Sequence, residues 1–269
     1  MTRVAMVVEY DGTRYCGWQH QRHCEAVQAV VERAISKVAN HDVRVHCAGR
    51  TDTGVHATGQ VIHFDTTAVR TERSWLLGTN SQLPNDVSMS NAAIVSDRFH
   101  ARYDALERQY RYLINNAVRR HAVFRDRAMV VHEPLTTEPM QAAADHLLGE
   151  HDFSAFRAAG CQAHHPNRSV RAIRVQRAGE WIIVDIAANA FLHHMVRNIV
   201  GLLIYVGSGK APPEYAGKVL AGKDRTAAPA MAAACGLYLS KVVYPKPLGD
   251  GWASTDRSFR AEWPLLPVN

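Results

Sequence analysis

The stretch Gly49–Thr66 (GRTDTGVHATGQVIHFDT) contains the change of pattern that organises the first part of the chain. Its first twelve residues hold three glycines and three threonines, a composition typical of a loop. Its last seven, QVIHFDT, read as a strand. Val43, Val45 and Cys47 alternate just before it, so the loop is expected to join two strands.

Outward from this loop, strand and helix periods follow one another through both halves of the chain. In the first half, RVAMVVEY (3–10) alternates like a strand, and apolar spacing predicts a helix over 27–38. The second half repeats this outline, with strands predicted at 107–115, 171–177, 181–188 and 236–245 and helices at 136–148, 191–206 and 213–221. Strands in hairpins beside segregated helices indicate an α+β fold.

The repeated outline indicates a duplicated unit. We expect two similar α+β halves that share a central, mostly antiparallel sheet with flanking helices. The first half, residues 1–105, carries the loop with Asp52, and the second half covers residues 106–245. The tail 246–269 is rich in proline and glycine and is expected on the surface.

Composition and charge limit the class of protein. The chain has 269 residues, 47% of them hydrophobic and 21% charged, which is typical of a globular protein rather than a disordered one. Its net charge of +6 favours an anionic partner, of which nucleic acid is the commonest large one. On charge alone, a basic protein with no such partner remains an equal alternative.

Cysteine spacing and hydropathy point to the cytoplasm. The five cysteines, Cys16, Cys24, Cys47, Cys161 and Cys235, are scattered without a C-x-x-C spacing, so no disulfide framework is expected. The N-terminus reaches a charge and a turn too soon for a signal peptide. The most apolar predicted helix carries His193, His194 and Arg197, so we expect no membrane span.

Asp52 and Arg50 distinguish the loop from an ordinary turn. A carboxylate just before Gly54 commonly caps a turn, and that structural role remains an alternative for Asp52. Against it, Arg50 is close enough to act beside Asp52, and His56 offers another donor. The glycines of the loop let its backbone come near a ligand.

The complete string is more specific than its parts, because it resembles the signature of the tRNA pseudouridine synthase A family. Four further segments are similar to other blocks of this family and follow in the same order: EYDGTRYCGWQ (9–19), FHARYDALERQYRY (99–112), NAFLHHMVRNIVG (189–201) and GLYLSKVVYP (236–245). The resemblance covers about residues 3–245, nearly the whole chain.

This resemblance implies an isomerase that converts uridine to pseudouridine at positions 38, 39 or 40 of the tRNA anticodon stem-loop. It implies a homodimer and neither a metal nor an organic cofactor. Asp52 corresponds to the single essential aspartate of the family. The target nucleotide must first leave the stack, at a cost on the order of a few kcal/mol. Arg50 matches an arginine that contacts tRNA and supports this flipping, a role that suits a planar cation.

Residues of the second half are expected to meet Asp52 and the flipped base. Tyr110 matches a tyrosine that stacks on the uracil, whereas Tyr112, on the same side of the predicted strand, is assigned to the core. Leu237 matches an aliphatic residue packed against the base, with an ordinary core leucine as the alternative. Arg197 lies on an apolar helix and needs an anion if it is buried, and the resemblance pairs its equivalent with Asp52.

Further residues are expected to contact RNA. One segment mixes aromatic and basic side chains as binders of unpaired RNA do, and the family uses it to touch tRNA: Phe99, His100, Ala101, Arg102 and Tyr103. A second contacting stretch matches Gly160, Cys161, Gln162, Ala163 and His164, and Arg70 matches another contact position.

Two other functions remain open. An RNA-binding module could keep the groove and lose catalysis, although binding alone would not require Asp52. A hydrolase of N-glycosidic bonds is disfavoured, because glycosidases usually use paired carboxylates and this loop supplies one. His193 and His194, expected on different helix faces, and the other histidine pairs show no zinc spacing, so no catalytic metal is predicted.

Overall fold

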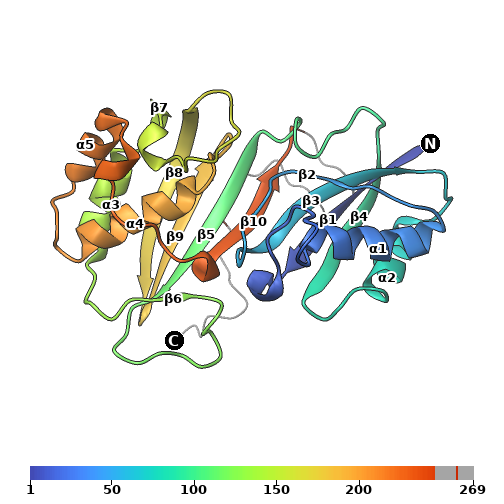
Figure 1. Ribbon diagram of the computed structural model, residues 1–269, viewed down its shortest axis with the longest axis horizontal. Helices are drawn as coiled ribbons and strands as arrows, with labels where there is room; N and C mark the ends of the chain where they lie inside the picture. Colours follow the sequence, from blue (N-terminus) through green and yellow to red (C-terminus); the bar gives the residue numbers. More distant parts are fainter. Residues whose placement is uncertain (246–258, 260–269) are drawn as a thin grey trace. The chain divides into compact units, whose positions relative to one another are not determined.

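The computed structural model describes residues 1–245 and residue 259, and these form ten strands and five α-helices. The chain divides into two compact units, each with strands and helices of its own (Figure 1). The first unit contains Met1–Arg108 and the strand that begins near Tyr238. The second unit contains Gln109–Leu237. The α+β fold class predicted from the sequence is confirmed.

The sheet of the first unit is built around its longest strand. Its order is β4 (Val87–Val95), β1 (Thr2–Tyr10), β3 (His56–Thr66) and β10 (Leu237–Val243), and β2 (His46–Cys47) also pairs with β3. β1 is antiparallel to both β3 and β4. β10 runs parallel to β3, with Tyr238 opposite His56. The predicted halves place this last strand in the second half, whereas it pairs with the first unit.

Helices α1 (Val27–Ala39) and α2 (Glu72–Asn80) belong to the first unit (Figure 1). α1 confirms the predicted helix, because its apolar positions recur at helical spacing and are buried. It ends at Asn40, whose φ of 58° is the left-handed conformation common after a helix. α2 begins at Thr71, whose side chain accepts a hydrogen bond from the Ser74 amide. The sequence pattern predicted neither α2 nor β4.

The sheet of the second unit centres on a hairpin. Its order is β5 (Glu107–Asn115), β9 (Trp181–Ala188), β8 (Asn167–Ala178) and β7 (Gly149–Asp152), and β6 (Met129–Val130) runs parallel to β5. β8 and β9 are antiparallel, as are β7 and β8. The β8–β9 turn contains Gly179 at φ 59°. The predicted strands at 107–115 and 181–188 are confirmed residue for residue.

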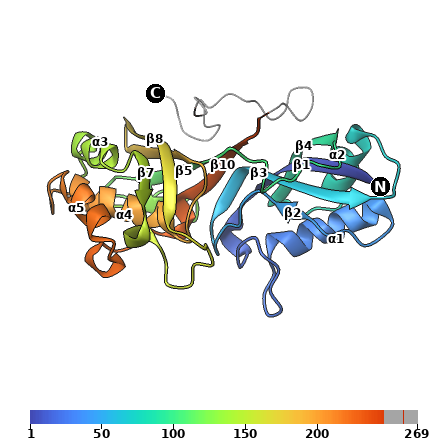
Figure 2. The ribbon, with the colours of Figure 1, turned by 90° about the horizontal axis from the view of Figure 1, so that it is seen from above.

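Three helices accompany this second sheet: α3 (Thr137–Asp145), α4 (Met195–Gly207) and α5 (Tyr215–Gly222). α3 contacts β8, α4 and α5, and Figure 2 shows this helical group in one view. The helix predicted over 191–206 begins only at Met195, because His194 takes the left-handed conformation with φ 64°. His193 and His194 therefore precede the helix, and the prediction that they occupy different helix faces is wrong.

Two expectations about the Asp52 loop and its preceding strand, and one about the cysteines, are wrong. His56 to Gln60 form the start of β3, so the loop is shorter than its glycines indicate, and the predicted strand before it shrinks to β2. Cys16 and Cys24 form a disulfide, because the segment between them folds back and brings their Cα atoms to 6.2 Å.

None of the helices in the described part of the chain has the length and apolar character that a membrane span requires. The predicted tail 246–269 lies outside the described residues apart from Phe259.

Candidate active site

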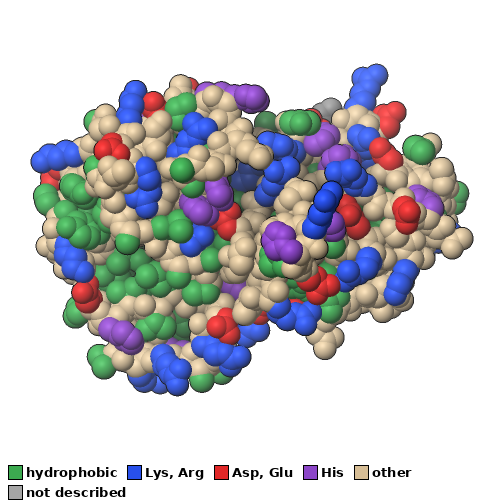
Figure 3. Space-filling view, viewed as in Figure 1, with side chains coloured by type: hydrophobic (Ala, Val, Ile, Leu, Met, Phe, Trp, Pro, Cys, Tyr) green, Lys and Arg blue, Asp and Glu red, His purple; other side chains and the backbone are tan. Residues whose placement is uncertain are grey.

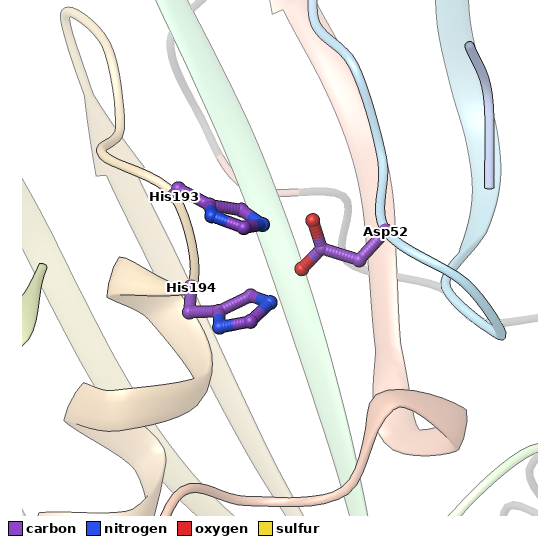
Figure 4. Close-up of side chains that lie close together, drawn as sticks. All are labelled: Asp52, His193 and His194. Carbon is purple, nitrogen blue, oxygen red and sulfur yellow. The ribbon is translucent and has the colours of Figure 1, made fainter. Parts of the chain in front are cut away.

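Asp52 lies on the loop that leads into β3 of the first unit (Figure 4). The amide of Val55 donates to the carbonyl of Asp52 at 3.1 Å, which closes a four-residue turn. Gly54 occupies the third position of this turn with φ 75°, a conformation that a glycine adopts at little cost. The Asp52 residue is half-buried. The turn uses only the backbone of Asp52. Asp52 can therefore belong to a turn, as the sequence allowed, and its carboxylate can still take part in chemistry.

The segment Tyr10–Trp18 holds this loop in place. The Tyr10 hydroxyl lies 2.8 Å from the Thr51 hydroxyl, and the Trp18 amide donates to the Thr51 carbonyl at 3.0 Å. The amide of Gly54 donates to the carbonyl of Tyr15 at 3.4 Å. We call Tyr10–Trp18 the clamp segment. Because it bonds to residues on both sides of Asp52, it restricts the backbone from which the carboxylate projects.

Gly17 makes the closest approach between the clamp segment and the loop. Its φ is 84°, and a Cβ at this position would lie 2.6 Å from the Thr51 carbonyl oxygen and 2.9 Å from the Asp52 carbonyl carbon. Both values are below normal van der Waals contact, so only glycine fits there without displacement of the loop. This contact was not visible in the sequence, where Gly17 is only one of 17 glycines.

His56 supports the loop from inside the unit. Its residue is 1% exposed, and its Nδ1 accepts a hydrogen bond from the Gly12 amide at 2.9 Å. The Asp11 carboxylate is 3.2 Å from the same nitrogen, and the Tyr238 ring stacks on the imidazole at a centroid distance of 4.6 Å. The expectation that His56 offers a ligand another donor is therefore wrong, because burial and these contacts make it part of the packing.

The segment Phe99–Tyr103 divides into buried and exposed side chains. Phe99 and Ala101 are 7% and 0% exposed, so their side chains pack in the first unit. His100 is half-buried, whereas Arg102 and Tyr103 are exposed, Tyr103 to 75%. The Tyr103 ring lies 4.2 Å from the His100 ring and 5.8 Å from the Arg102 guanidinium carbon. A planar cation and two rings thus lie together at the surface, an arrangement suited to stacking on a base.

A histidine cluster lies beneath this surface and was missed from the sequence. The ring of His63 stacks on His46 at 5.1 Å and meets the edge of His100 at 4.5 Å. Nδ1 of His63 accepts the Ala101 amide at 3.1 Å, which ties β3 to the predicted RNA-contacting segment. Burial lowers the pKa of His63 to about 4, and the nearby positive groups add to this shift. His63 is therefore neutral at pH 7.

Arg50 and Arg70, two further predicted RNA contacts, are both exposed. The guanidinium of Arg70 donates to the carbonyl of Val69 at 2.9 Å. Lys and Arg side chains, drawn blue, are spread over the face seen in Figure 3. The planar guanidinium of an exposed arginine presents several donors that match the geometry of a phosphate.

In the second unit, Tyr110 and Tyr112 differ in their surroundings. Tyr110 is 8% exposed, and its ring meets the Phe191 ring edge-on at 5.0 Å. Tyr112 is fully buried, and its hydroxyl donates to the Ala233 carbonyl at 2.7 Å. The assignment of Tyr112 to the core is confirmed. Leu237, the predicted base-packing residue, is 5% exposed.

Arg197 is half-buried on α4, a helix whose residues are mostly apolar. Its Nε donates to the Ala232 carbonyl at 2.9 Å, and the Ala232 amide donates back to the Arg197 carbonyl at 3.1 Å. These two hydrogen bonds hold the backbone and the side chain of Arg197 beside Ala232. The pairing of Arg197 with Asp52 stays a prediction.

The segment 160–164 forms a loop at the surface of the second unit, with Gly160, Gln162 and His164 exposed and Cys161 and Ala163 half-buried. Arg157 donates to the carbonyls of Cys161 and Ala163, both at 2.8 Å. The pKa of the Cys161 thiol is lowered. Burial opposes this shift, but it is outweighed by the backbone N–H groups of His193 and Ala163 and by the Arg157 guanidinium.

His193 and His194 lie side by side just before α4, with ring centroids 3.9 Å apart (Figure 4). His193 is exposed and His194 half-buried. The amide of His193 also reaches the Sγ of Cys161 at 3.4 Å. These contacts join the start of α4 to the surface loop 160–164.

Known proteins are similar to this chain over most of its length. A family model described as tRNA pseudouridine synthase matches residues 6–104 and 143–245. Proteins named tRNA pseudouridine synthase A are similar over most of their length. The protein of Hydrogenovibrio crunogenus is 50% identical over 91% of this chain and 94% of its own, and that of Vibrio cholerae is 52% identical over 92% and 94%. That of Shewanella woodyi is 52% identical over 91% and 94%.

The first matched region contains Asp52 and the clamp segment, and the second contains Arg197 and Leu237. Tyr110 lies between the two matched regions. The two matched regions cover most of the described chain, and about half of the aligned residues are identical to those of the relatives. The chain belongs to the tRNA pseudouridine synthase family.

Proposed function

We propose that this protein isomerises uridine to pseudouridine at positions 38, 39 and/or 40 of the tRNA anticodon stem-loop. The observation that carries the proposal is the placement of Asp52. This half-buried carboxylate stands on a loop whose backbone is bonded on both sides by the clamp segment. The loop belongs to a sequence about half identical to proteins named tRNA pseudouridine synthase A. A carboxylate on a restrained backbone suits chemistry at a sugar carbon, where small displacements are costly.

In this reaction the bond between N1 of uracil and C1′ of ribose breaks, and a bond between C5 and C1′ forms. C5 loses its proton and N1 gains one, so atoms and electrons balance without a cofactor. We assign Asp52 the attack on the nucleoside, and Tyr110 stacks on the flipped uracil. Arg197 pairs with the carboxylate and orients it by charge-assisted hydrogen bonds. Leu237 packs against the base.

Binding of the anticodon arm is assigned to Arg50 and Arg70, to the segment 99–103 and to the surface loop 160–164. Arg50 supports flipping of the nucleotide, and Arg70 contacts a phosphate. The exposed ring and guanidinium of Tyr103 and Arg102 stack or pair with the RNA, while the buried Phe99 and Ala101 shape the segment that carries them. The surface loop 160–164 makes the second contact. We also propose that the protein acts as a homodimer, in the cytoplasm, where its tRNA substrate is found.

Release of tritium tests the proposal. The full chain is incubated with unmodified tRNA that carries tritium at C5 of uracil, beside an Asp52→Asn variant of nearly equal shape. Wild-type protein is expected to release tritium and form pseudouridine, whereas the variant loses at least about 10³-fold in rate while it still binds tRNA. Asp42→Asn, a change of an exposed carboxylate outside the loop, is the matched control and keeps the wild-type rate.

Two results would contradict this proposal. Equal release by wild type and Asp52→Asn would remove Asp52 from the chemistry. Tight tRNA binding by the wild type without any release would leave an RNA-binding module as the function.

A further inference from the structure

The Tyr10–Thr51 hydroxyl pair is a buried polar contact that the proposed chemistry does not use. Tyr10 and Thr51 are 2% and 7% exposed, and their hydroxyl oxygens are 2.8 Å apart. Thr51 immediately precedes Asp52. We propose that Tyr10 is a positioning residue, which acts through Thr51 to hold the Asp52 carboxylate in its reactive orientation. The inference rests on the proposed function and deepens it.

Both peptide groups beside Asp52 are held by hydrogen bonds. The carbonyl of the preceding peptide, on Thr51, accepts the Trp18 amide at 3.0 Å. The carbonyl of the following peptide, on Asp52, accepts the Val55 amide at 3.1 Å. These two bonds restrain φ and ψ of Asp52, the torsions that lie between the two peptides. The hydroxyl contact with Tyr10 fixes where the Thr51 side chain points, and it therefore also restrains ψ of Thr51, the torsion that orients the first of these peptides.

Tyr10 is a fixed anchor for this contact. It is the last residue of β1 and lies opposite Ala57 of β3 and Val87 of β4, so its backbone is paired on both sides. Its ring lies 5.9 Å from the ring of Trp18, which also contacts Thr51 through its amide. A buried phenol requires a hydrogen-bond partner, and Thr51 provides it. The hydroxyl of Tyr10 is therefore a rigid reference point for the loop.

The strength of the Tyr10–Thr51 hydrogen bond sets the expected change in rate. A neutral buried hydrogen bond contributes about 0.5–1.5 kcal/mol, which corresponds to roughly 2- to 13-fold in a rate. If the bond only stabilised the fold, its loss would lower the melting temperature and leave the rate per folded molecule unchanged. If it positions Asp52, its loss lowers the rate of the chemical step and leaves tRNA affinity unchanged. These two outcomes are measurably different.

The test uses the full-length chain with a Tyr10→Phe variant, which removes one oxygen atom. We expect the single-turnover rate of tritium release from saturating tRNA to fall about fivefold, with unchanged tRNA affinity. Thr51→Val is expected to show a similar loss, and Thr51→Ser, which keeps the hydroxyl, retains most of the rate. The double variant Tyr10→Phe/Thr51→Val is expected to be no slower than either single change, because both remove the same contact.

Tyr15→Phe is the matched control. Tyr15 lies in the same clamp segment and is 1% exposed, but its hydroxyl donates to Asp86 at 2.8 Å instead of to the loop. This variant keeps the backbone carbonyl that Gly54 uses, so the wild-type rate is expected. Hydrogen exchange at the Val55 amide provides a readout independent of catalysis. It is expected to accelerate in Tyr10→Phe and to remain unchanged in Tyr15→Phe.

The outcomes separate this inference from the proposed function. A wild-type rate in Tyr10→Phe, an additive double variant, or equal losses in Tyr10→Phe and Tyr15→Phe would overturn the positioning role. If the wild type itself released no tritium, the proposed function would fail. The exchange of the Val55 amide would then decide whether Tyr10 immobilises the loop: faster exchange in Tyr10→Phe alone supports it, and unchanged exchange refutes it.

Discussion

Arg111 of β5 and Asp185 of β9 form a buried, bidentate ion pair in the second unit. Nε of Arg111 lies 2.7 Å from one carboxylate oxygen of Asp185, and Nη2 lies 2.9 Å from the other. The side chains are 5% and 3% exposed, so each charge depends on the other for solvation. We therefore expect Asp185→Asn to reduce the free energy of unfolding by about 3–5 kcal/mol, measured by urea denaturation.

A surface pair in the first unit serves as the control for this prediction. Arg33 and Glu25 are 2.6 Å apart but 63% and 48% exposed, and Glu25→Gln is expected to cost at most about 1 kcal/mol. Similar losses in Asp185→Asn and Glu25→Gln would show that burial does not strengthen the dependence of Arg111 on its partner.

Gly17→Ala tests the close approach between the clamp segment and the Asp52 loop. The added Cβ would lie 2.6 Å from the Thr51 oxygen at a backbone φ of 84°, so the loop must move. We expect tritium release to fall by more than about 10-fold, because a displacement near 1 Å at a reacting group is costly. Gly209→Ala is the control: its φ is 75°, but the described atoms leave open space for its Cβ. That variant carries only the backbone strain of about 1 kcal/mol and is expected to keep its activity.

The low pKa of His63 predicts a loss of stability in mild acid. Burial lowers this pKa from 6.5 to about 4, so between these values the unfolded chain binds a proton that the folded chain does not. The free energy of unfolding is therefore highest above pH 6.5, where His63 is neutral in both states, and it decreases as the pH falls toward 4. In urea unfolding, the wild type is expected to lose stability over this window more steeply than His63→Gln. The exposed His20→Gln should follow the wild type, and equal slopes for wild type and His63→Gln would contradict the prediction.

The Cys16–Cys24 disulfide predicts a dependence of stability on reducing agent. It closes a short loop with a sequence separation of 8, for which the chain-entropy model gives a stabilisation of about 2.5 kcal/mol. Dithiothreitol is expected to lower the unfolding free energy of the wild type by this amount and to leave Cys24→Ser unaffected. Cys235→Ser should respond to dithiothreitol as the wild type does, since Cys235 is not part of this disulfide. An unchanged wild type would refute a contribution from the disulfide.

Strong local patterns made much of the fold predictable from the sequence. α1 and β9 were predicted because their apolar residues repeat at the helical period or fill a continuous run. α2 and β4 were missed because α2 is short and mixed in polarity, with only Trp75 and Thr79 buried. β10 was recognised as a strand, but its pairing with β3 joins residues about 180 positions apart in the chain and leaves no local signal.

The candidate site shows the same division. Asp52 was found because its loop has an unusual composition and a family resemblance. The clamp segment around it was not, because the bonds from Tyr10 and Trp18 to Thr51 arise only after β1 and β3 have paired. His56 was read as a donor for a ligand, since nothing in its neighbours in the sequence predicts that Gly12 and Tyr238 enclose it.

The β3–β10 pairing also has a consequence during synthesis on the ribosome. β3 ends at Thr66, but its parallel neighbour emerges only when Leu237–Val243 have been translated. At ~5–20 residues per second, the edge of β3 at His56 and Ala57 waits on the order of ten seconds or longer for its partner. An unpaired strand edge can pair with a strand of another nascent chain and so lead to aggregation. A circularly permuted gene that starts with β10 would shorten this vulnerable interval and raise the yield of folded protein.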